Sequence, residues 1–227
     1  MGELRPMGKG WRVELRRTAG ARRMTLRVSR LDGRVTLTVP PHVPDAEAEA
    51  FVAAKSEWIE RNVAQSPDRN AVGIGTRLPV RGRLHEVVAG PGRAARIDGD
   101  CILAPDRAAG PAIATLLKSI ARDRLSAAID AHAAGLGVRA GRLTLRDTRS
   151  RWGSCTADGN LMLSWRLAMA PDAVADYVAL HEVAHLIRMD HSPDFWALVA
   201  SRTPDWKRHR DWLRTDGAAL HAYRFGV

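Results

Sequence analysis

Cysteine is nearly absent from this 227-residue chain, which contains only Cys101 and Cys155. Two thiols on unrelated segments cannot form the framework of a disulfide-rich secreted domain, and they cannot make a zinc site alone. No apolar stretch approaches the ~18 uncharged residues of a membrane span, and the arginine-rich first thirty residues lack the apolar core of a signal peptide. These absences predict a reduced, soluble, cytoplasmic protein that does not associate with a membrane.

Lysine is also scarce, since only four of the 35 basic residues are lysines. The formal net charge of +10 is of the kind found in nucleic-acid-binding proteins, because clustered cations release counterions when they bind phosphate. An arginine excess beside abundant alanine and glycine is equally typical of compositional bias. The charge therefore leaves nucleic acid open as a partner without establishing it.

The amino-terminal part of the chain has the pattern of strands followed by a helix. Apolar and polar residues alternate with the period of a strand in three segments: Val13–Leu15, Met24–Val28 and Val35–Val39. The three segments predict that a β-meander opens the protein. Asp45 can cap a helix whose apolar residues recur at helical spacing as far as Ile59. We expect this single helix to pack on the sheet.

The rest of the chain mixes short strands with longer helices. Strand patterns occur at five places: 78–80, 86–88, 95–103, 143–145 and 161–163. A long helix is predicted from Pro111 to His132, with Gly135 or Gly137 at its end. The chain is therefore predicted to be an α+β protein in two domains. Residues 1–110 form a β-rich amino-terminal domain, and residues 111–227 form a helical domain with a small antiparallel sheet.

A metal-binding motif lies in the helix predicted from Asp172 to Ile187. Within it, His185 is four positions after His181, so both imidazoles lie on one face and can reach the same metal ion. Glu182 lies at a different angle around the helix axis, from which its carboxylate can contact a metal-bound water. A buried glutamate between two histidines costs too much free energy to be simple packing. The motif predicts an HExxH active-site helix with Glu182 as general base.

A catalytic zinc ion takes three protein ligands and keeps one position open. No glutamate follows Glu182, which leaves four kinds of third ligand: His191, His209, His221 or an aspartate. We favour His191, which requires the helix to end near residues 188–189 and the backbone to reverse. Asp190 tolerates the left-handed conformation that such a reversal needs. His209 lies in a charged run and is expected in solvent or on the rim of the cleft.

Several stretches of the sequence resemble the YgjP-like metallopeptidases, which are related to the SprT-like and minigluzincin zinc peptidases. These stretches are Ser150–Cys155, Asp176–Val178, His181–Leu186 and Asp190–Trp196. The resemblance spans nearly the whole chain and is most specific between residues 149 and 196. It implies a zincin-like domain with one zinc ion per chain, held by His181, His185 and His191, and Glu182 as general base. Asp190 stands where the family pattern has asparagine, and both residues allow the turn.

The function predicted from these features is hydrolysis of peptide bonds in a peptide or protein substrate by a metal-activated water. Arg151, Tyr177 and His209 are candidates for a second donor to the developing oxyanion. Gly153 and Ser154 belong to a segment that could hold an extended substrate by backbone pairing. Two alternatives remain open: a nucleic-acid-associated protein with a zinc site, and a zinc hydrolase that acts on a non-peptide amide.

Overall fold

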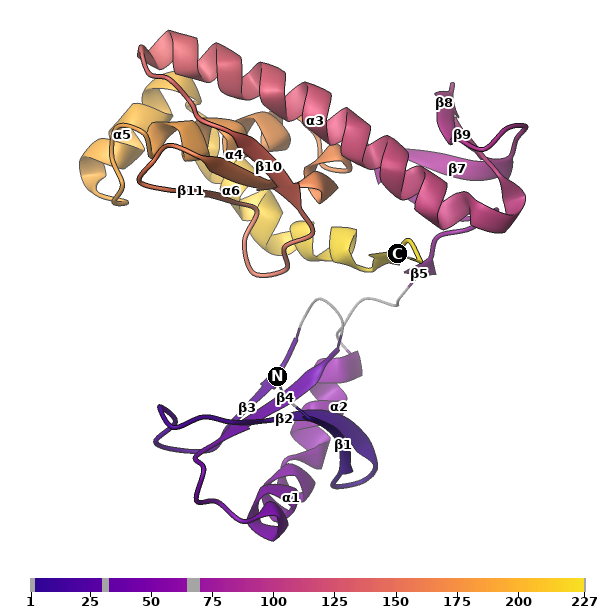
Figure 1. The fold of residues 1–227 in the computed structure, drawn as a ribbon, viewed down its shortest axis with the longest axis vertical. Helices are drawn as coiled ribbons and strands as arrows, with labels where there is room; N and C mark the ends of the chain where they lie inside the picture. The colour runs from indigo at the N-terminus through magenta and orange to yellow at the C-terminus, as the bar shows by residue number, and fades with distance from the viewer. Residues whose placement is uncertain (1–2, 30–32, 65–69, 227) are drawn as a thin grey trace. The chain divides into compact units, whose positions relative to one another are not determined.

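The computed structural model describes residues 3–29, 33–64 and 70–226 of the chain (Figure 1). The chain divides into two compact units, Met1–Arg69 and Asn70–Val227. The predicted α+β class is confirmed, because several small sheets accompany six α-helices within the described ranges. None of the helices in these ranges is both long enough and apolar enough to cross a membrane.

The first unit contains a four-stranded sheet that is not the predicted meander. Its strands are β1 (Glu3–Met7), β2 (Trp11–Arg17), β3 (Thr25–Val28) and β4 (Val35–Val39), and their order is β1-β2-β4-β3. β2 pairs in parallel with β4, so β3 lies at the edge and not between them. The alternation in the sequence identified the buried side chains of β2 and β4 correctly, but it carries no information on which strands pair.

Two helices, not the single one predicted, cover this sheet. α1 (Asp45–Ala54) and α2 (Ser56–Ala64) are separated at Lys55. Asp45 is the first helical residue and makes no capping hydrogen bond; its carboxylate instead pairs with Arg5 and Arg17 on the strands. Val52 and Ile59 are fully buried in the core that the helices share with the sheet. The helical periodicity was therefore correct, and the break at Lys55 was not predicted.

The second unit begins with a strand pair and a four-stranded sheet. β5 (Asn70–Ala71) pairs with β13 (Tyr223–Arg224) near the end of the chain. The sheet has the order β6-β7-β9-β8 and consists of β6 (Arg77–Val80), β7 (Arg83–Ala89), β8 (Arg96–Asp98) and β9 (Cys101–Ala104). A 3₁₀ turn, η1 (Asp106–Ala108), leads into α3 (Ala109–Leu136), which ends at Gly137 in the left-handed conformation with φ 67°.

The predicted domain boundary near residue 110 does not coincide with the boundary between the compact units. Leu78, Val87 and Ile102 of the sheet share one core with Ile113 and Leu117 of α3. Strands before residue 110 and the helix after it therefore bury the same apolar surface. The chain divides instead between Arg69 and Asn70.

A second, three-stranded sheet and the remaining helices complete this unit. The sheet has the order β10-β12-β11, with β10 (Leu143–Arg146) parallel and β11 (Gly153–Cys155) antiparallel to β12 (Leu161–Ser164). It is therefore mixed and not purely antiparallel as predicted. The other elements are η2 (Trp165–Ala168), α4 (Asp172–Ala184), α5 (Pro193–Arg202), α6 (Trp206–Thr215) and η3 (Gly217–His221).

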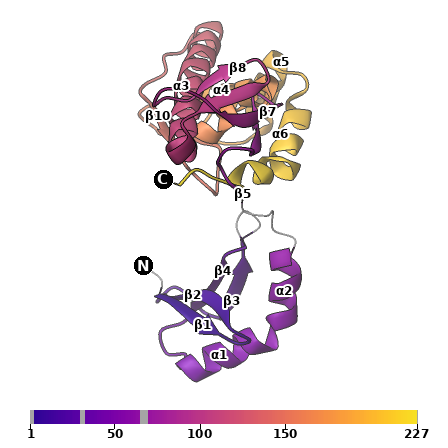
Figure 2. The same cartoon turned by 90° about the vertical axis from the view of Figure 1, so that its right-hand side faces the viewer.

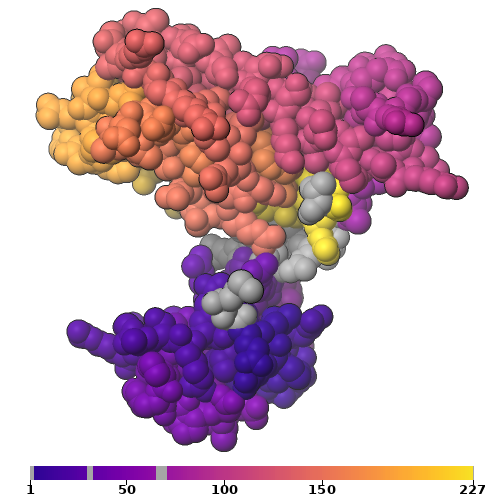
Figure 3. Space-filling model, viewed as in Figure 1, coloured from indigo at the N-terminus to yellow at the C-terminus, as the bar shows by residue number. Residues whose placement is uncertain are grey.

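The arrangement of these helices places α4 in the interior of the second unit. α4 lies between α3 and α6 in both views (Figures 1 and 2). The space-filling view shows α3 along one long side of the unit and α5 at one of its ends (Figure 3). Val174, Val178, Leu180 and Val183 of α4 are buried in the main core. A helix that is buried nearly all round holds its polar side chains in fixed positions.

Candidate metal centre and its cleft

The helix that carries the histidine motif ends earlier than predicted. α4 begins after Pro171 and ends at Ala184, so that His185 is its C-cap. The next backbone amides turn back on the helix end, where the amide of Arg188 donates to the carbonyl of Ala184 at 3.1 Å. The sequence analysis expected the helix to continue to residues 187–189. The earlier end leaves a longer connection through which the chain returns to the face of His181.

The structure brings the three predicted metal ligands together. One ring nitrogen from each of His181, His185 and His191 lies within 4.8 Å of those of the other two. The Nε2 atoms of His181 and His191 are 3.1 Å apart. The ring centroids are separated by 4.9 Å for His181 and His185 and by 4.7 Å for His185 and His191. These three side chains form the candidate metal centre.

The environment of His181 and His191 lowers the pKa of both rings and so favours their neutral form. Burial lowers the pKa of His181 to about 3, and the charges of His185, His191 and Arg210 act in the same direction. Nδ1 of His185 lies 2.9 Å from the carbonyl oxygen of Arg188, to which its N–H donates. Because Nδ1 carries the proton of this hydrogen bond, Nε2 of His185 keeps a free lone pair, an arrangement common among metal-binding histidines.

The donor set fits a divalent metal ion. Two neutral imidazole nitrogens that face each other at 3.1 Å can share at most one proton between them, and a third imidazole nitrogen lies close by. Nδ1 of His181 is buried without a hydrogen-bond partner among the described residues, so no protein group fixes the tautomer of this ring. A cation among the three lone pairs satisfies all of them at once.

His191 is positioned by the start of α5. The Oδ1 atom of Asp190 accepts a hydrogen bond from the amide of Ser192 at 3.2 Å, and Ser192 is the N-cap of α5. Phe195 is fully buried beneath the histidines, and its ring stacks on His185 with centroids 4.6 Å apart. Asp190 does not adopt the left-handed conformation expected of it; among the described non-glycine residues, Arg81 alone has a positive φ. The gradual turn after Ala184 makes that conformation unnecessary.

Glu182 lies beside the histidines, against the backbone of β11. Its side chain is 6% exposed, and burial raises its pKa to about 7, although the charge of Arg151 opposes this shift. A Cβ atom added to Gly153 would lie 2.4 Å from Oε1 of Glu182 and 2.7 Å from its Cγ. The carboxylate is therefore packed against a position that has room only for glycine.

We expect Gly153→Ala to displace the Glu182 side chain and to lower kcat by about 10²-fold, the cost of misplacing a catalytic group by roughly 1 Å. The metal content should remain that of the wild type, because the three atoms nearest to a Cβ at Gly153 all belong to Glu182 and not to a histidine. Gly73→Ala is the matched control, since a Cβ at Gly73 would meet nothing within 4 Å. Steady-state kinetics and metal analysis of both variants test this, and unchanged kinetics of Gly153→Ala would contradict it.

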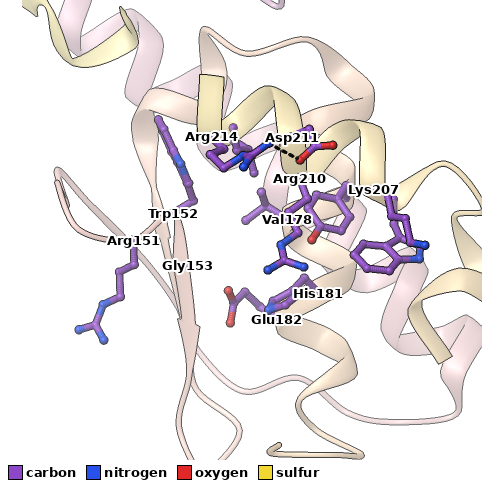
Figure 4. A pocket seen from close by; sticks show the side chains of 13 residues that line it. Arg151, Trp152, Gly153, Val178, His181, Glu182, Lys207, Arg210, Asp211 and Arg214 are labelled. Atoms are coloured by element: carbon purple, nitrogen blue, oxygen red, sulfur yellow. Dashed lines mark ion pairs between the residues drawn. The ribbon is translucent and has the colours of Figure 1, made fainter. Parts of the chain in front are cut away.

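A cleft of about 740 Å³ opens beside His181 and Glu182 (Figure 4). Of the residues predicted to contact substrate, Arg151, Gly153 and Tyr177 line it, whereas Ser154 and His209 do not. The ring of His209 lies 6.1 Å from that of Tyr177. Tyr177 is buried, which raises the pKa of its hydroxyl to about 12. His221, another candidate ligand, instead packs against Trp152, with ring centroids 5.1 Å apart.

One wall of the cleft was not predicted. It consists of side chains from α6: Trp206, Lys207, Arg210, Asp211, Leu213 and Arg214. Figure 4 shows the guanidinium of Arg210 directed toward His181 and Glu182, whereas that of Arg151 points away from them. The spacing of Lys207, Arg210 and Arg214 places these cations on one helical face, and this pattern could have predicted a basic surface.

The chain is similar to one protein family and to a solved structure. The family model described as YgjP-like, metallopeptidase domain, matches residues 22–216. Among solved structures, the metallopeptidase zymogen of Pyrococcus abyssi abylysin is 20% identical, with a TM-score of 0.38, and the match covers 40% of this chain and 93% of that chain. A structural likeness of this size carries no argument by itself. A comparison with curated proteins finds no match.

The family match covers most of the chain, including the histidine cluster, Glu182 and the cleft. The cluster could bind the metal ion that the family's activity requires. The chain therefore belongs to the YgjP-like metallopeptidase family and is a metal-dependent peptidase.

Proposed function

We propose that this protein is a zinc-dependent metallopeptidase that hydrolyses peptide bonds with one zinc ion per chain. His181, His185 and His191 hold the ion. The observation that carries this proposal is the convergence of their three ring nitrogens within 4.8 Å, beside a buried glutamate. Three neutral imidazoles suit zinc, which prefers nitrogen and sulfur ligands in a tetrahedral arrangement. We place the second unit among the zincin-like folds on the same grounds.

When bound, zinc supplies Lewis acidity that polarises a carbonyl and lowers the pKa of a coordinated water to about 7. Glu182 is the general base: its carboxylate accepts the proton of the attacking water and later passes it to the leaving amine. Its burial and its contact with Gly153 hold the carboxylate at the edge of the cleft. Tyr177 is the donor to the developing oxyanion, because it lines the cleft and burial keeps its hydroxyl protonated.

β11 holds the substrate in an extended conformation. On one side it pairs with β12, and on the other no strand pairs with it among the described residues. Because Gly153 lines the cleft, this free edge runs beside Glu182. An extended peptide that adds to the edge would form backbone hydrogen bonds with residues such as Ser154, whose side chain is not required. Its scissile bond would then pass the histidines.

The direct test is metal content combined with turnover. Protein that has been stripped of metal and reconstituted should bind about one zinc ion per chain by elemental analysis. It should hydrolyse members of a peptide panel, lose this activity to a chelator and regain it with zinc. Binding of less than about a tenth of an equivalent by folded protein would contradict the metal assignment. Hydrolysis of non-peptide amides alone would contradict the substrate assignment.

A further inference from the structure

Arg210 is a cation without a carboxylate partner at the centre of the cleft wall. Among the described residues, no ion pair or hydrogen bond occupies its guanidinium, whereas the neighbouring Arg214 pairs with Asp211 at 3.2 Å. Two indoles hold Arg210 in place: its guanidinium carbon lies 5.1 Å from the ring centroid of Trp196 and 6.0 Å from that of Trp206. Such cation–π contacts fix the direction of a side chain while leaving its hydrogen-bond donors free.

The guanidinium of Arg210 points toward the catalytic groups. Figure 4 shows it directed into the cleft, toward His181 and Glu182. The guanidinium carbon lies 5.1 Å from the ring centroid of Trp196, and that ring lies 5.6 Å from the rings of both His181 and His191. Arg210 is therefore close to the candidate metal centre. Arg210 can therefore meet a substrate group next to the scissile bond.

The cleft as a whole carries uncompensated positive charge. Four basic residues line it: Arg151, Lys207, Arg210 and Arg214. Two acidic residues, Glu182 and Asp211, also line it; Asp211 pairs with Arg214, and among the described residues no ion pair joins either carboxylate to Arg210. A fixed guanidinium with free donors binds a carboxylate through paired hydrogen bonds better than any other common side chain.

We propose that Arg210 is a specificity-determining residue that binds a carboxylate of the substrate, so that the enzyme prefers acidic peptides with this carboxylate next to the scissile bond. The inference rests on the proposed peptidase function and names the substrate class of that site. The carboxylate belongs either to an aspartate or glutamate side chain or to the carboxyl end of the peptide. Both sources present the same two oxygens to the guanidinium.

The aromatic residues around Arg210 favour a peptide over a nucleic acid. Single-stranded nucleic acids bind basic grooves through bases that stack on free aromatic faces. Trp196 and Trp206 already stack on each other, with centroids 4.2 Å apart and an interplanar angle of 16°, and Trp206 is 9% exposed. Trp152 packs against His221. Each of these three indoles is thus engaged within the protein.

The test compares kcat/KM for peptides that differ only in glutamate or glutamine beside the cleaved bond, each with a free and with an amidated carboxyl end. The zinc-loaded wild type should prefer the carboxylate-bearing peptides by roughly fivefold or more, the effect of one well-oriented guanidinium–carboxylate pair. In Arg210→Gln this ratio should fall to about one, through a higher KM for the acidic peptide, and Arg210→Lys should restore part of it. Arg214→Gln is the matched control and should keep the ratio, because Asp211 already pairs with Arg214.

The outcomes separate this inference from the proposed function. Equal rates on glutamate and glutamine peptides, with either carboxyl end, would overturn the inference and leave the peptidase assignment intact. An equal loss of kcat/KM on the glutamate and glutamine peptides in Arg210→Gln would also overturn the inference, because Arg210 would then act on the scissile carbonyl or on the fold. If no peptide is hydrolysed, the proposed function fails, and calorimetric binding of the same peptides to Glu182→Gln still measures the carboxylate preference. Competition by a single-stranded oligonucleotide that requires Arg210, without any carboxylate preference, would favour nucleic acid as the ligand.

Discussion

Glu182→Gln will abolish peptide hydrolysis and leave the metal bound. Glutamine has the shape of glutamate but cannot accept the proton of the attacking water, and loss of a general base costs roughly 10²- to 10⁴-fold in rate. The isosteric change suits this position, because Glu182 is 6% exposed and packed against Gly153, where a larger change would alter the packing. Glu182 is also outside the group of three histidines whose nitrogens converge.

The measurement combines kcat for a cleaved peptide with the zinc content of the same preparation. His181→Ala is the matched contrast, because it removes a proposed metal ligand and should lose the ion together with the activity. If Glu182→Gln released the zinc, the glutamate would be a ligand and not the base. If it kept full activity, another group would take the proton.

His191→Ala will weaken zinc binding by orders of magnitude, whereas His209→Ala will spare it. His191 is one of the three proposed ligands, whose ring nitrogens converge, with its Nε2 atom 3.1 Å from that of His181. His209 lies beside Tyr177 and does not belong to the group of converging side chains. Loss of one of three protein ligands removes a large part of the binding free energy. Among the described residues, no hydrogen bond joins the ring of His209 to a proposed ligand, so His209 does not orient one and its loss should change zinc affinity little.

Titration of both variants with zinc against a competing chelator decides between the two histidines. The wild type and His209→Ala should give the same dissociation constant. Unchanged affinity in His191→Ala, or loss of affinity in His209→Ala, would reverse the assignment of the third ligand. Circular dichroism of both variants checks that the fold is retained.

The parts of the fold that follow from local patterns could be predicted from the sequence. Local patterns depend on the spacing of neighbouring side chains. Such patterns predicted the helix of residues 109–136, the helix of the histidine motif and the strands around residues 78, 87 and 102. Strand pairing could not be predicted, because β2 pairs in parallel with β4 although β3 lies between them in the sequence. The boundary predicted near residue 110 differs from the one between the compact units for a related reason: one core contains Leu78 and Ile102, which precede that point, and Ile113, which follows it.

In the candidate site, too, the features that depend on local sequence could be predicted, and those that depend on tertiary packing could not. His181, Glu182 and His185 lie on one helix, and His191 follows within a short turn, so their convergence depends on local geometry. Arg210 was not predicted, because its position depends on how α6 packs against α4. The sequence of α6 contains several basic residues, and only the tertiary structure shows which of them enter the cleft.

The stack of Trp196 on Trp206 connects the candidate metal centre to the basic wall of the cleft, so we expect the two to evolve together. Trp196 borders the rings of His181 and His191, each at 5.6 Å, and also supports Arg210. A substitution at position 196 would therefore change the packing around the two histidines and around Arg210 at the same time. We expect residues 196, 206 and 210 to vary together among relatives, because residues in contact constrain one another's replacement. Substrate preference would then diverge in correlated steps, and a change of Arg210 alone would be rare.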